Sequence, residues 1–283
     1  MVRILMRPKP SNYSYVFDFE ENYDCDSTRQ WMTANWTNCF YYCAIYAILV
    51  FGIRRLMRNH NGFRLKGLLI LWNTMLATFS LIGFARTAPE LFRVLNNYGL
   101  HHSVCVSSYL EDDSVSGFWS WLFVLSKLPE LGDTIFIVLR KQPLIFLHWY
   151  HHITVLLYSW FSYHEFTSSA RWFVVMNYSV HSMMYTYYAA RAMGYRPPTQ
   201  ISMFITASQL TQMIVGCFIN YTTYGYLKAG GPQSCRVSKL NVTLSSAMYL
   251  SYLVLFAQFF YNAYILKSKG GRGGATQKAS KQH

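Results

Sequence analysis

The chain has 283 residues, of which 52% are hydrophobic and only 13% are charged. Soluble domains carry about 25% charged residues, so this composition argues against a soluble protein. The formal net charge of +13 does not indicate a nucleic-acid partner, because the basic residues follow the loop pattern of a membrane protein. No positively charged segment followed by an apolar stretch opens the chain, so we expect no cleaved signal peptide.

The apolar residues are gathered into runs long enough to cross a hydrocarbon core about 30 Å thick, which takes about 20 residues. Seven such runs are expected, at residues 38–57, 66–86, 117–139, 143–163, 170–191, 199–220 and 243–266. Residues 1–37 are polar and acidic and predict a lumenal segment, and residues 267–283 predict a basic, flexible cytosolic tail. The fold class predicted from this pattern is an all-α integral membrane protein with one seven-span domain, residues 38–266.

The predicted loops divide into two sets by charge. One set of loops and the tail contain basic residues but no acidic residue. The basic residues are Arg54, Arg55, Arg58, Arg64, Lys66, Arg140, Lys141, Arg191, Arg196 and the lysines and arginine of 267–283. The opposite loops contain the loop acids. The positive-inside rule places the basic face in the cytosol, with the N-terminus in the lumen and the C-terminus in the cytosol. This face either reflects ordinary topology and attraction to anionic lipid or binds a polyanionic ligand.

Cysteines and glycosylation sequons fall on the predicted lumenal side. Cys105 and Cys235 lie in loops that would face an oxidising compartment, so they either form a disulfide or remain free thiols. Asn12, Asn35 and Asn241 each begin an acceptor sequon on the same side.

The third predicted span contains charges. Lys127, Glu130 and Asp133 recur every three residues, within about 120° of one helix face. Pro129 and Gly132 are expected to bend or loosen the helix there. Charged groups inside a membrane are costly unless they are paired, so the three either form a structural salt-bridge network or belong to a functional site.

Polar side chains follow one face of each of the next three spans. They are His148, His151 and His152 in the fourth span, Asn177, His181, Tyr185 and Tyr188 in the fifth, and Thr206, Gln209 and Gln212 in the sixth. Together with the charges of the third span, they predict a closed polar site in the cytosolic half of the membrane. The first two spans contain little that is polar beyond residues 72–74 and are expected to be structural.

The histidine pattern permits two chemistries. With Glu130 and Asp133, the histidines are numerous enough for a di-iron site of the desaturase or hydroxylase kind, although the expected Glu-x-x-His pairing is absent. Alternatively, a neutral imidazole attacks a thioester, neighbouring histidines move protons, and groups such as Asn177, Gln209 and Tyr185 stabilise the oxyanion. A seven-helix lipid receptor or transporter is a third, non-enzymatic alternative.

Four segments resemble, in order, the motifs of the very long chain fatty acid elongases. Lys127-Leu-Pro-Glu-Leu-Gly-Asp-Thr134 resembles KxxExxDT, His148-Trp-Tyr-His-His152 resembles HxxHH, His181-Ser-Met-Met-Tyr-Thr-Tyr-Tyr188 resembles HxxMYxYY, and Thr206-Ala-Ser-Gln-Leu-Thr-Gln212 resembles TxxQxxQ. Two features resemble the branch of the family that acts on saturated and monounsaturated chains. They are the Glu-Leu-Gly-Asp-Thr residues of the first motif and Pro143, which lies five positions before the first histidine of the HxxHH box.

The resemblance implies a 3-ketoacyl-CoA synthase of the endoplasmic reticulum membrane. Such an enzyme condenses a long-chain acyl-CoA with malonyl-CoA, releases CO2 and CoA, and needs no cofactor or metal. It also implies that six of the seven spans form an inverted barrel around an acyl tunnel. We expect His151 to attack the thioester, and His181 and His152 to manage protons and position the malonyl group. Lys127, Glu130 and Asp133 are expected to orient the histidine box.

The basic cytosolic face is then expected to hold the CoA phosphates through Arg140, Lys141, Arg191 and Arg196. His148 is expected to be catalytic with the other histidines. The remaining polar stripe residues are expected to contact the substrate, namely Asn177, Tyr185, Tyr188, Thr206, Gln209 and Gln212. The implied partners are membrane lipid and the ketoacyl reductase, dehydratase and enoyl reductase of the elongation cycle, with a homodimer as a further expectation. The tail departs from an ideal dilysine retrieval signal. Lys281 is third from the end, but positions 279 and 280 are alanine and serine rather than lysine.

Overall fold

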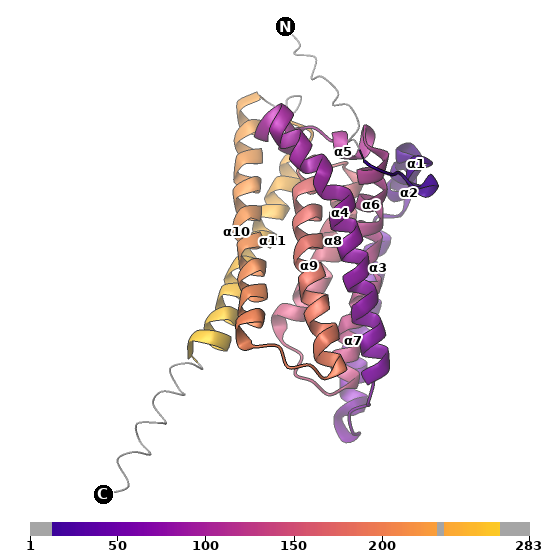
Figure 1. Ribbon diagram of the computed structural model, residues 1–283, viewed down its shortest axis with the longest axis vertical. Coiled ribbons are helices and arrows are strands. Elements are labelled where there is room, and N and C mark those ends of the chain that lie inside the picture. Colours follow the sequence, from indigo (N-terminus) through magenta and orange to yellow (C-terminus); the bar gives the residue numbers. More distant parts are fainter. Residues whose placement is uncertain (1–12, 231–234, 267–283) are drawn as a thin grey trace, which may run out of the picture.

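The computed structural model describes residues 13–230 and 235–266, which form helices and connecting turns without a strand (Figure 1). The N-terminal segment contains α1 (Asp18–Glu21) and α2 (Cys25–Asn35). The longer helices are α3 (Asn38–Leu56), α4 (Lys66–Cys105), α6 (Ser114–Ser126), α7 (Gly132–Leu139), α8 (Phe146–His164), α9 (Ala170–Met193), α10 (Thr199–Gly230) and α11 (Lys239–Phe260). Shorter turns are a 3-10 helix at Met57–Asn59, α5 (Ser108–Glu111), a 3-10 helix at Pro129–Leu131 and a π-helix at Tyr261–Leu266.

Among the described residues, four helices are long and apolar enough to cross a membrane: α3, α4, α10 and α11, the first and last together with the turns that extend them. Large apolar side chains are exposed on these helices, including Ile48, Leu71, Phe218 and Val254. Exposed apolar surface of this extent is what a bilayer covers. The protein is therefore an all-helical membrane protein.

The predicted apolar runs coincide with helices, but two boundaries were wrong. The stretch 87–116, expected to be a loop, continues α4 as far as Cys105 and then forms α5. The helix continues past residue 86 partly because Glu90 need not face water. Its carboxylate is buried and paired with Arg171 of α9. The helix changes direction at Gly99, whose φ of 76° lies in the left-handed region that glycine tolerates. Helix α10 also runs to Gly230, beyond the expected end at residue 220.

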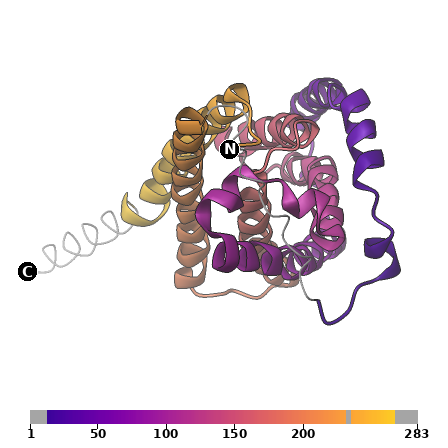
Figure 2. The same ribbon diagram turned by 90° about the horizontal axis from the view of Figure 1, so that it is seen from above.

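The helices close a ring. Helices α4, α9, α10, α11, α8 and α6 contact one another in this order, α6 returns to α4, and α3 lies outside the ring against α7 and α8 (Figure 2). The tight contact of α4 with α9 depends on Gly83, where a Cβ atom would lie 2.4 Å from the ring of Tyr178. Glycine therefore lets the two helices approach until this tyrosine fills the space between them.

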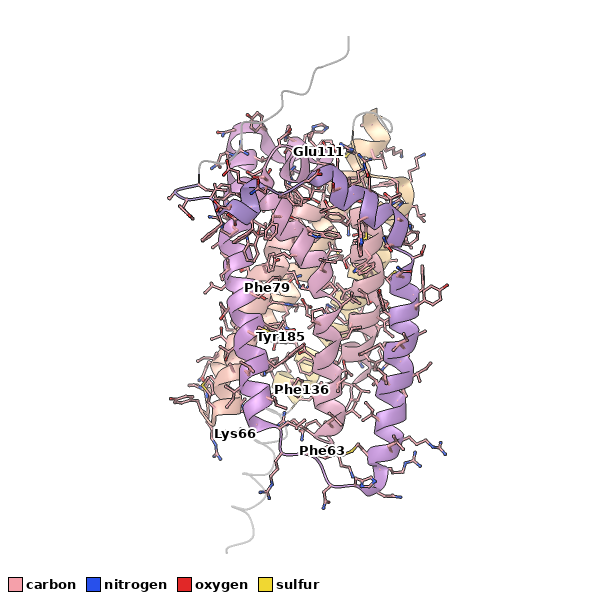
Figure 3. The ribbon with its side chains drawn as sticks, turned by 90° about the vertical axis from the view of Figure 1, so that its right-hand side faces the viewer. Phe63, Lys66, Phe79, Glu111, Phe136 and Tyr185 are labelled. Atoms are coloured by element: carbon pink, nitrogen blue, oxygen red, sulfur yellow. A yellow bond between two sulfur atoms is a disulfide. The ribbon has the colours of Figure 1, made fainter. Side chains whose placement is uncertain are left out.

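The two ends of the ring differ in charge. Figure 3 shows Glu111 at one end, Phe63 and Lys66 at the other, and Tyr185 between them. We name these ends the acidic end and the basic end. At the acidic end, carboxylates meet arginines in the pairs Glu20–Arg86, Glu90–Arg171 and Glu111–Arg236.

The N-terminal segment is fastened to the acidic end through Glu20. Its carboxylate accepts hydrogen bonds from Nε of Arg86 at 2.8 Å, from Nε1 of Trp119 at 2.7 Å and from the backbone N–H of Phe17 at 3.0 Å. Burial by itself raises the pKa of the Glu20 carboxyl, but these hydrogen bonds and the Arg86 charge outweigh it and hold that pKa below its ordinary value. The segment is thus tied to both α4 and α6.

Candidate active site

The third predicted span is interrupted where its motif begins, as Pro129 and Gly132 predict. Helix α6 ends at Ser126, the 3-10 turn Pro129–Leu131 follows, and α7 starts at Gly132. Proline lacks the N–H that would continue the α-helical hydrogen bonds. A Cβ atom on Gly132 would lie 2.9 Å from the indole of Trp72, so glycine lets α4 approach the break closely. The interruption places the charged side chains inside the ring.

Lys127 and Glu130 form a buried ion pair at this break. The Lys127 Nζ lies 2.7 Å from Oε1 of Glu130, and the two side chains are 2% and 5% exposed. The ammonium also donates to Oδ1 of Asn177 at 3.1 Å, so the Asn177 amide group turns its Nδ2 toward Nε2 of His181, 3.0 Å away. An amide nitrogen only donates, so Nε2 of His181 accepts and its proton resides on Nδ1. The pair therefore fixes the tautomer of one site histidine through Asn177.

Asp133 does not join this ion pair. Its Oδ1 accepts a hydrogen bond from Nε1 of Trp72 at 2.6 Å, and its Oδ2 accepts one from the hydroxyl of Tyr185 at 2.7 Å. The three charges of the motif thus divide into a pair and a separate carboxylate. Trp72 and Asn73, expected to be structural, contribute to the site, because Asn73 lines the same cavity as Asp133.

The histidine box occupies the first turns of α8. Nε2 of His148 lies 3.0 Å from the hydroxyl of Thr134, which in turn lies 2.6 Å from the hydroxyl of Tyr46. The ring of His152 lies 4.5 Å from that of His148 and 5.7 Å from that of His151, measured between centroids. His151 faces α11, where its ring lies 4.8 Å from that of Tyr252. The three imidazoles therefore have different neighbours, and His151 is the one turned toward the last helix.

A cavity of about 540 Å³ lies in the ring against these residues. Its predicted lining residues are Asp133, Arg140, His148, His151, His152, Asn177, His181, Tyr185, Tyr188, Arg191, Gln209 and Gln212. Arg140 and Arg191, near the ends of α7 and α9, place two guanidinium groups at its basic end. Residues of α11, Phe256 and Phe259, complete the wall. The predicted stripes of four spans therefore do converge, and α4 and α11 add two walls that the sequence reasoning left out.

A narrower cavity of about 60 Å³ continues toward the acidic end. It shares His151, Asn177, Gln212 and Met213 with the larger one. Beyond the shared residues its walls are mostly aromatic and aliphatic, with a few serine hydroxyls. Tyr163 lines its acidic end, and the Tyr163 hydroxyl lies 2.8 Å from that of Tyr23. His151 is thus the one box histidine at the junction of the two cavities.

Sequence comparisons identify the family of the chain. The model of the GNS1/SUR4 family (ELO) matches residues 31–272. The chain belongs to this family. It is 63% identical over 269 residues to "Very long chain fatty acid elongase 6" of Drosophila melanogaster, covering 95% of this chain and 84% of that one. It is 49% identical over 253 residues to the Homo sapiens protein of the same name, covering 89% and 94%. It is 42% identical over 259 residues to "Putative fatty acid elongase 3" of Caenorhabditis elegans, covering 91% and 80%.

Some residues expected to form the site lie outside the cavity of this GNS1/SUR4 family member. Lys127 and Glu130 do not line it and act on it only through Asn177 and His181. Thr206 is buried, with its hydroxyl 3.1 Å from that of Tyr264, and does not line it either. Lys141 lines a different hollow, and Arg196 is exposed beyond the end of α9. Position along a helical stripe does not distinguish a side chain that faces the cavity from one that supports a neighbour.

The cysteines and sequons have separate outcomes. Cys105 and Cys235 are joined by a disulfide at the acidic end. Asn241 cannot carry a glycan in this fold: it is 1% exposed, and its Nδ2 donates to Glu165 and Thr167 at 2.9 and 2.8 Å. Asn35 is half-buried and donates to a backbone carbonyl one turn earlier. The Asn12 sequon and the basic tail 267–283 lie outside the described residues.

One ring nitrogen each of His148 and His181 is engaged with a hydroxyl or an amide group, whereas Nδ1 of the buried His152 has no hydrogen-bond partner among the described residues. His148 meets Thr134, and His181 meets Asn177. Within residues 13–230 and 235–266, no group of three or more His, Cys, Asp and Glu side chains is arranged to hold a metal ion. The arrangement offers an imidazole at a cavity junction, a hydrogen-bonded histidine across from it, and amide and phenol donors around the space between them.

Proposed function

We propose that the protein condenses a long-chain saturated or monounsaturated acyl-CoA with malonyl-CoA to give 3-ketoacyl-CoA, CO2 and CoA, without a resident cofactor. The relatives named as very long chain fatty acid elongases support the reaction class. The observation that carries the assignment of roles is the position of His151, which borders both cavities. A thioester at this junction would direct its acyl chain into the narrow cavity and its carrier toward the basic end.

The first half-reaction transfers the acyl group to the protein. The imidazole of His151 attacks the thioester carbonyl, the carbon–sulfur bond breaks, and the N–H proton of the imidazole passes to the departing thiolate, so CoA leaves as the thiol. Gln212 and Asn177 lie at the same junction and supply amide donors for the oxyanion. The narrow cavity, at about 60 Å³, accepts an acyl chain only when its lining side chains rotate outward, because known ligand pockets measure about 300–1,000 Å³.

The second half-reaction forms the carbon–carbon bond. Malonyl-CoA enters the larger cavity and loses CO2, and its carbanion attacks the acyl carbon, which breaks the bond between that carbon and the His151 nitrogen. The departing imidazole takes up one proton from solution and is neutral again. His181 also lines the larger cavity, its Nδ1 atom lies 3.9 Å from Oε2 of Glu130, and His152 is buried beside His151. These two histidines position the malonyl group and handle protons. Asp133 keeps Tyr185 oriented through the hydrogen bond between them.

The basic end holds the carrier. Arg140 and Arg191 border the larger cavity, and CoA carries several phosphate charges that guanidinium groups bind in a bidentate manner. Tyr188, Gln209 and Gln212 line the same space and contact the carrier arm or the malonyl group.

Two measurements separate the reaction from its mechanism. Release of CO2 from labelled malonyl-CoA, dependent on palmitoyl-CoA, tests the condensation, and a series of acyl-CoA lengths gives the preferred chain. Intact mass after incubation with palmitoyl-CoA alone tests the acyl-enzyme. We expect one acyl group per chain in the wild type and none in His151→Ala. Absence of an adduct, or an adduct that His151→Ala retains, would overturn the acyl-histidine step while leaving the condensation intact.

The membrane arrangement completes the proposal. Seven spans, with α6 and α7 together as the third, would place the six-helix ring in the membrane as an inverted barrel, with the acidic end and N-terminus in the lumen of the endoplasmic reticulum and the basic end in the cytosol. The charge of the loops supports this orientation. The 3-ketoacyl product requires a reductase, a dehydratase and an enoyl reductase, so these enzymes are the expected partners, along with a second copy of the chain. Protease access to a tag at either terminus in sealed microsomes tests the orientation.

A further inference from the structure

A separate hollow of about 750 Å³ lies at the basic end, outside the ring and between α3 and the turn that joins α7 to α8. Its cations are Arg54, Arg55, Arg58 and Lys141, and Phe51 and Leu144 are among its apolar walls. We call it the basic hollow. It shares only Gln142 with the cavity that holds the histidines. It is therefore a distinct site rather than an extension of that cavity.

Among the described residues, no Asp or Glu lines the basic hollow. No Asp or Glu occurs in residues 51–66 or 134–164, the two segments that build it. At the acidic end, by contrast, buried or half-buried arginines such as Arg171 and Arg86 each meet a carboxylate. Several cations around one concave space are mutually repulsive, so an anion in that space would be bound favourably.

The basic hollow is held in shape by the backbone around it. Lys141 has a φ of 53°, in the left-handed region that a residue with a side chain rarely adopts. Its ammonium donates to the carbonyl oxygens of Arg58 at 3.2 Å and His60 at 2.9 Å, and the N–H of Phe63 donates to the carbonyl of Leu139 at 3.0 Å. These bonds fasten the loop after α3 to the end of α7. The arginines are therefore presented from a fixed frame.

We propose that the basic hollow binds the phosphorylated headgroup of an acidic phospholipid. Large apolar side chains of α3, including Ile45, Ile48 and Leu49, are exposed on the same helix that ends in Arg54 and Arg55. A lipid could thus lay its acyl chains along α3 and place its phosphates among the arginines. Basic pockets at the membrane surface between helices bind such headgroups in other membrane proteins. The apolar approach favours a membrane lipid over a soluble anion.

Binding of dioctanoyl phosphatidylinositol 4-phosphate to the purified full-length protein tests this site. The variant is Arg54→Gln with Arg58→Gln, and the matched control is Arg64→Gln with Lys66→Gln, which removes the same charge from the same end but outside the hollow. We expect about tenfold weaker binding for the first variant and less than about twofold for the control, because each cation near a surface contributes to anion binding only where it meets the anion. Dioctanoyl phosphatidylcholine should not bind measurably.

The result is independent of turnover, since the assay contains no acyl-CoA. Equal affinity of the wild type and the Arg54→Gln, Arg58→Gln variant would overturn the proposal. Displacement of the lipid by CoA, together with weaker CoA binding in that variant, would also overturn it and assign the hollow to the carrier. If the glutamine variant loses its thermal transition, Arg54→Lys with Arg58→Lys keeps the charge, and unchanged binding by that variant is then expected.

Discussion

Removing the ammonium of the buried pair should destabilise the protein strongly. Lys127→Met keeps an unbranched apolar side chain but removes the ammonium, which leaves the hydroxyl of Ser126, 2.9 Å away, as the hydrogen-bond partner of the Glu130 carboxylate. Breaking a buried ion pair by removing one member costs about 3–5 kcal/mol. Both side chains are nearly inaccessible, so this range applies to them. Because the Ser126 hydrogen bond remains, we expect the free energy of unfolding to fall by about 3 kcal/mol, at the lower end of the range.

The assay is thermal unfolding of each variant in the same detergent. At about 2–4 °C per kcal/mol for a chain of this size, Lys127→Met should lower the Tm by about 6–12 °C. The double variant with Glu130→Gln should recover part of this loss, since no unpaired charge is left. Arg236→Gln is the control, because it removes an arginine from a more exposed ion pair. In this pair the side chains of Arg236 and Glu111 are 40% and 34% exposed. Exposed pairs contribute less than about 1 kcal/mol to stability.

Two results would refute this reasoning. One is a Tm for Lys127→Met no lower than that of Arg236→Gln. The other is a double variant that unfolds as early as the sum of its two single variants. Turnover gives a second measurement, because Lys127 also orients Asn177 and thereby His181. We expect the double variant to regain stability without regaining turnover.

Three further outcomes follow from the acidic end. The pKa of Glu20 is lower in the folded protein than in the unfolded chain. Its contribution to the free energy of unfolding is therefore present above the unfolded pKa of about 4.3 and is lost as the pH falls through the folded pKa. Glu20→Gln should therefore unfold earlier than the wild type at pH 7, by about 1–3 kcal/mol, and the Tm difference should shrink in acid; a constant difference would refute the assignment. Cys105→Ser should lower stability by about 2–5 kcal/mol, the usual contribution of a disulfide, and reductant should have the same effect on the wild type and none on the variant. Thr243→Ala removes the Asn241 sequon without touching the buried asparagine, and electrophoretic mobility in glycosylating cells should not change.

The sequence predicts that the third to sixth spans carry the site, but it predicts neither the contribution of α4 and α11 nor how the side chains pair. The spacing of Lys127, Glu130 and Asp133 places them on one face, and the structure does bring all three inside the ring. The partners of Asp133, however, are Trp72 and Tyr185 from two other helices. Such contacts depend on how each helix is rotated about its axis, and periodicity within one helix does not contain that information. The signal that could have found Trp72 is the polar group it adds to an otherwise apolar span.

Helix ends and surface residues were harder to predict for a different reason. Hydropathy marks the length of a membrane, so α4 was expected to stop near residue 86, where polar residues begin. Thr87 and Glu90 are polar but buried, because they pack inside the ring rather than face water. Asn241 was misjudged in the same way, since a sequon triplet does not reveal that its asparagine is enclosed by Tyr158, Glu165 and Thr167.

The contact between Tyr23 and Tyr163 links the N-terminal segment, which contains none of the four motifs, to the acidic end of the narrow cavity. The two hydroxyls are 2.8 Å apart across 140 residues of sequence, and Thr28 lies 3.1 Å from the same Tyr163 oxygen. The N-terminal segment does not line the cavity, but it holds Tyr163, a residue of the cavity wall, from the outside. A truncated or N-terminally tagged preparation could retain every histidine and yet fit its acyl chain differently, so preparations with the two termini modified separately are needed when chain preferences are compared.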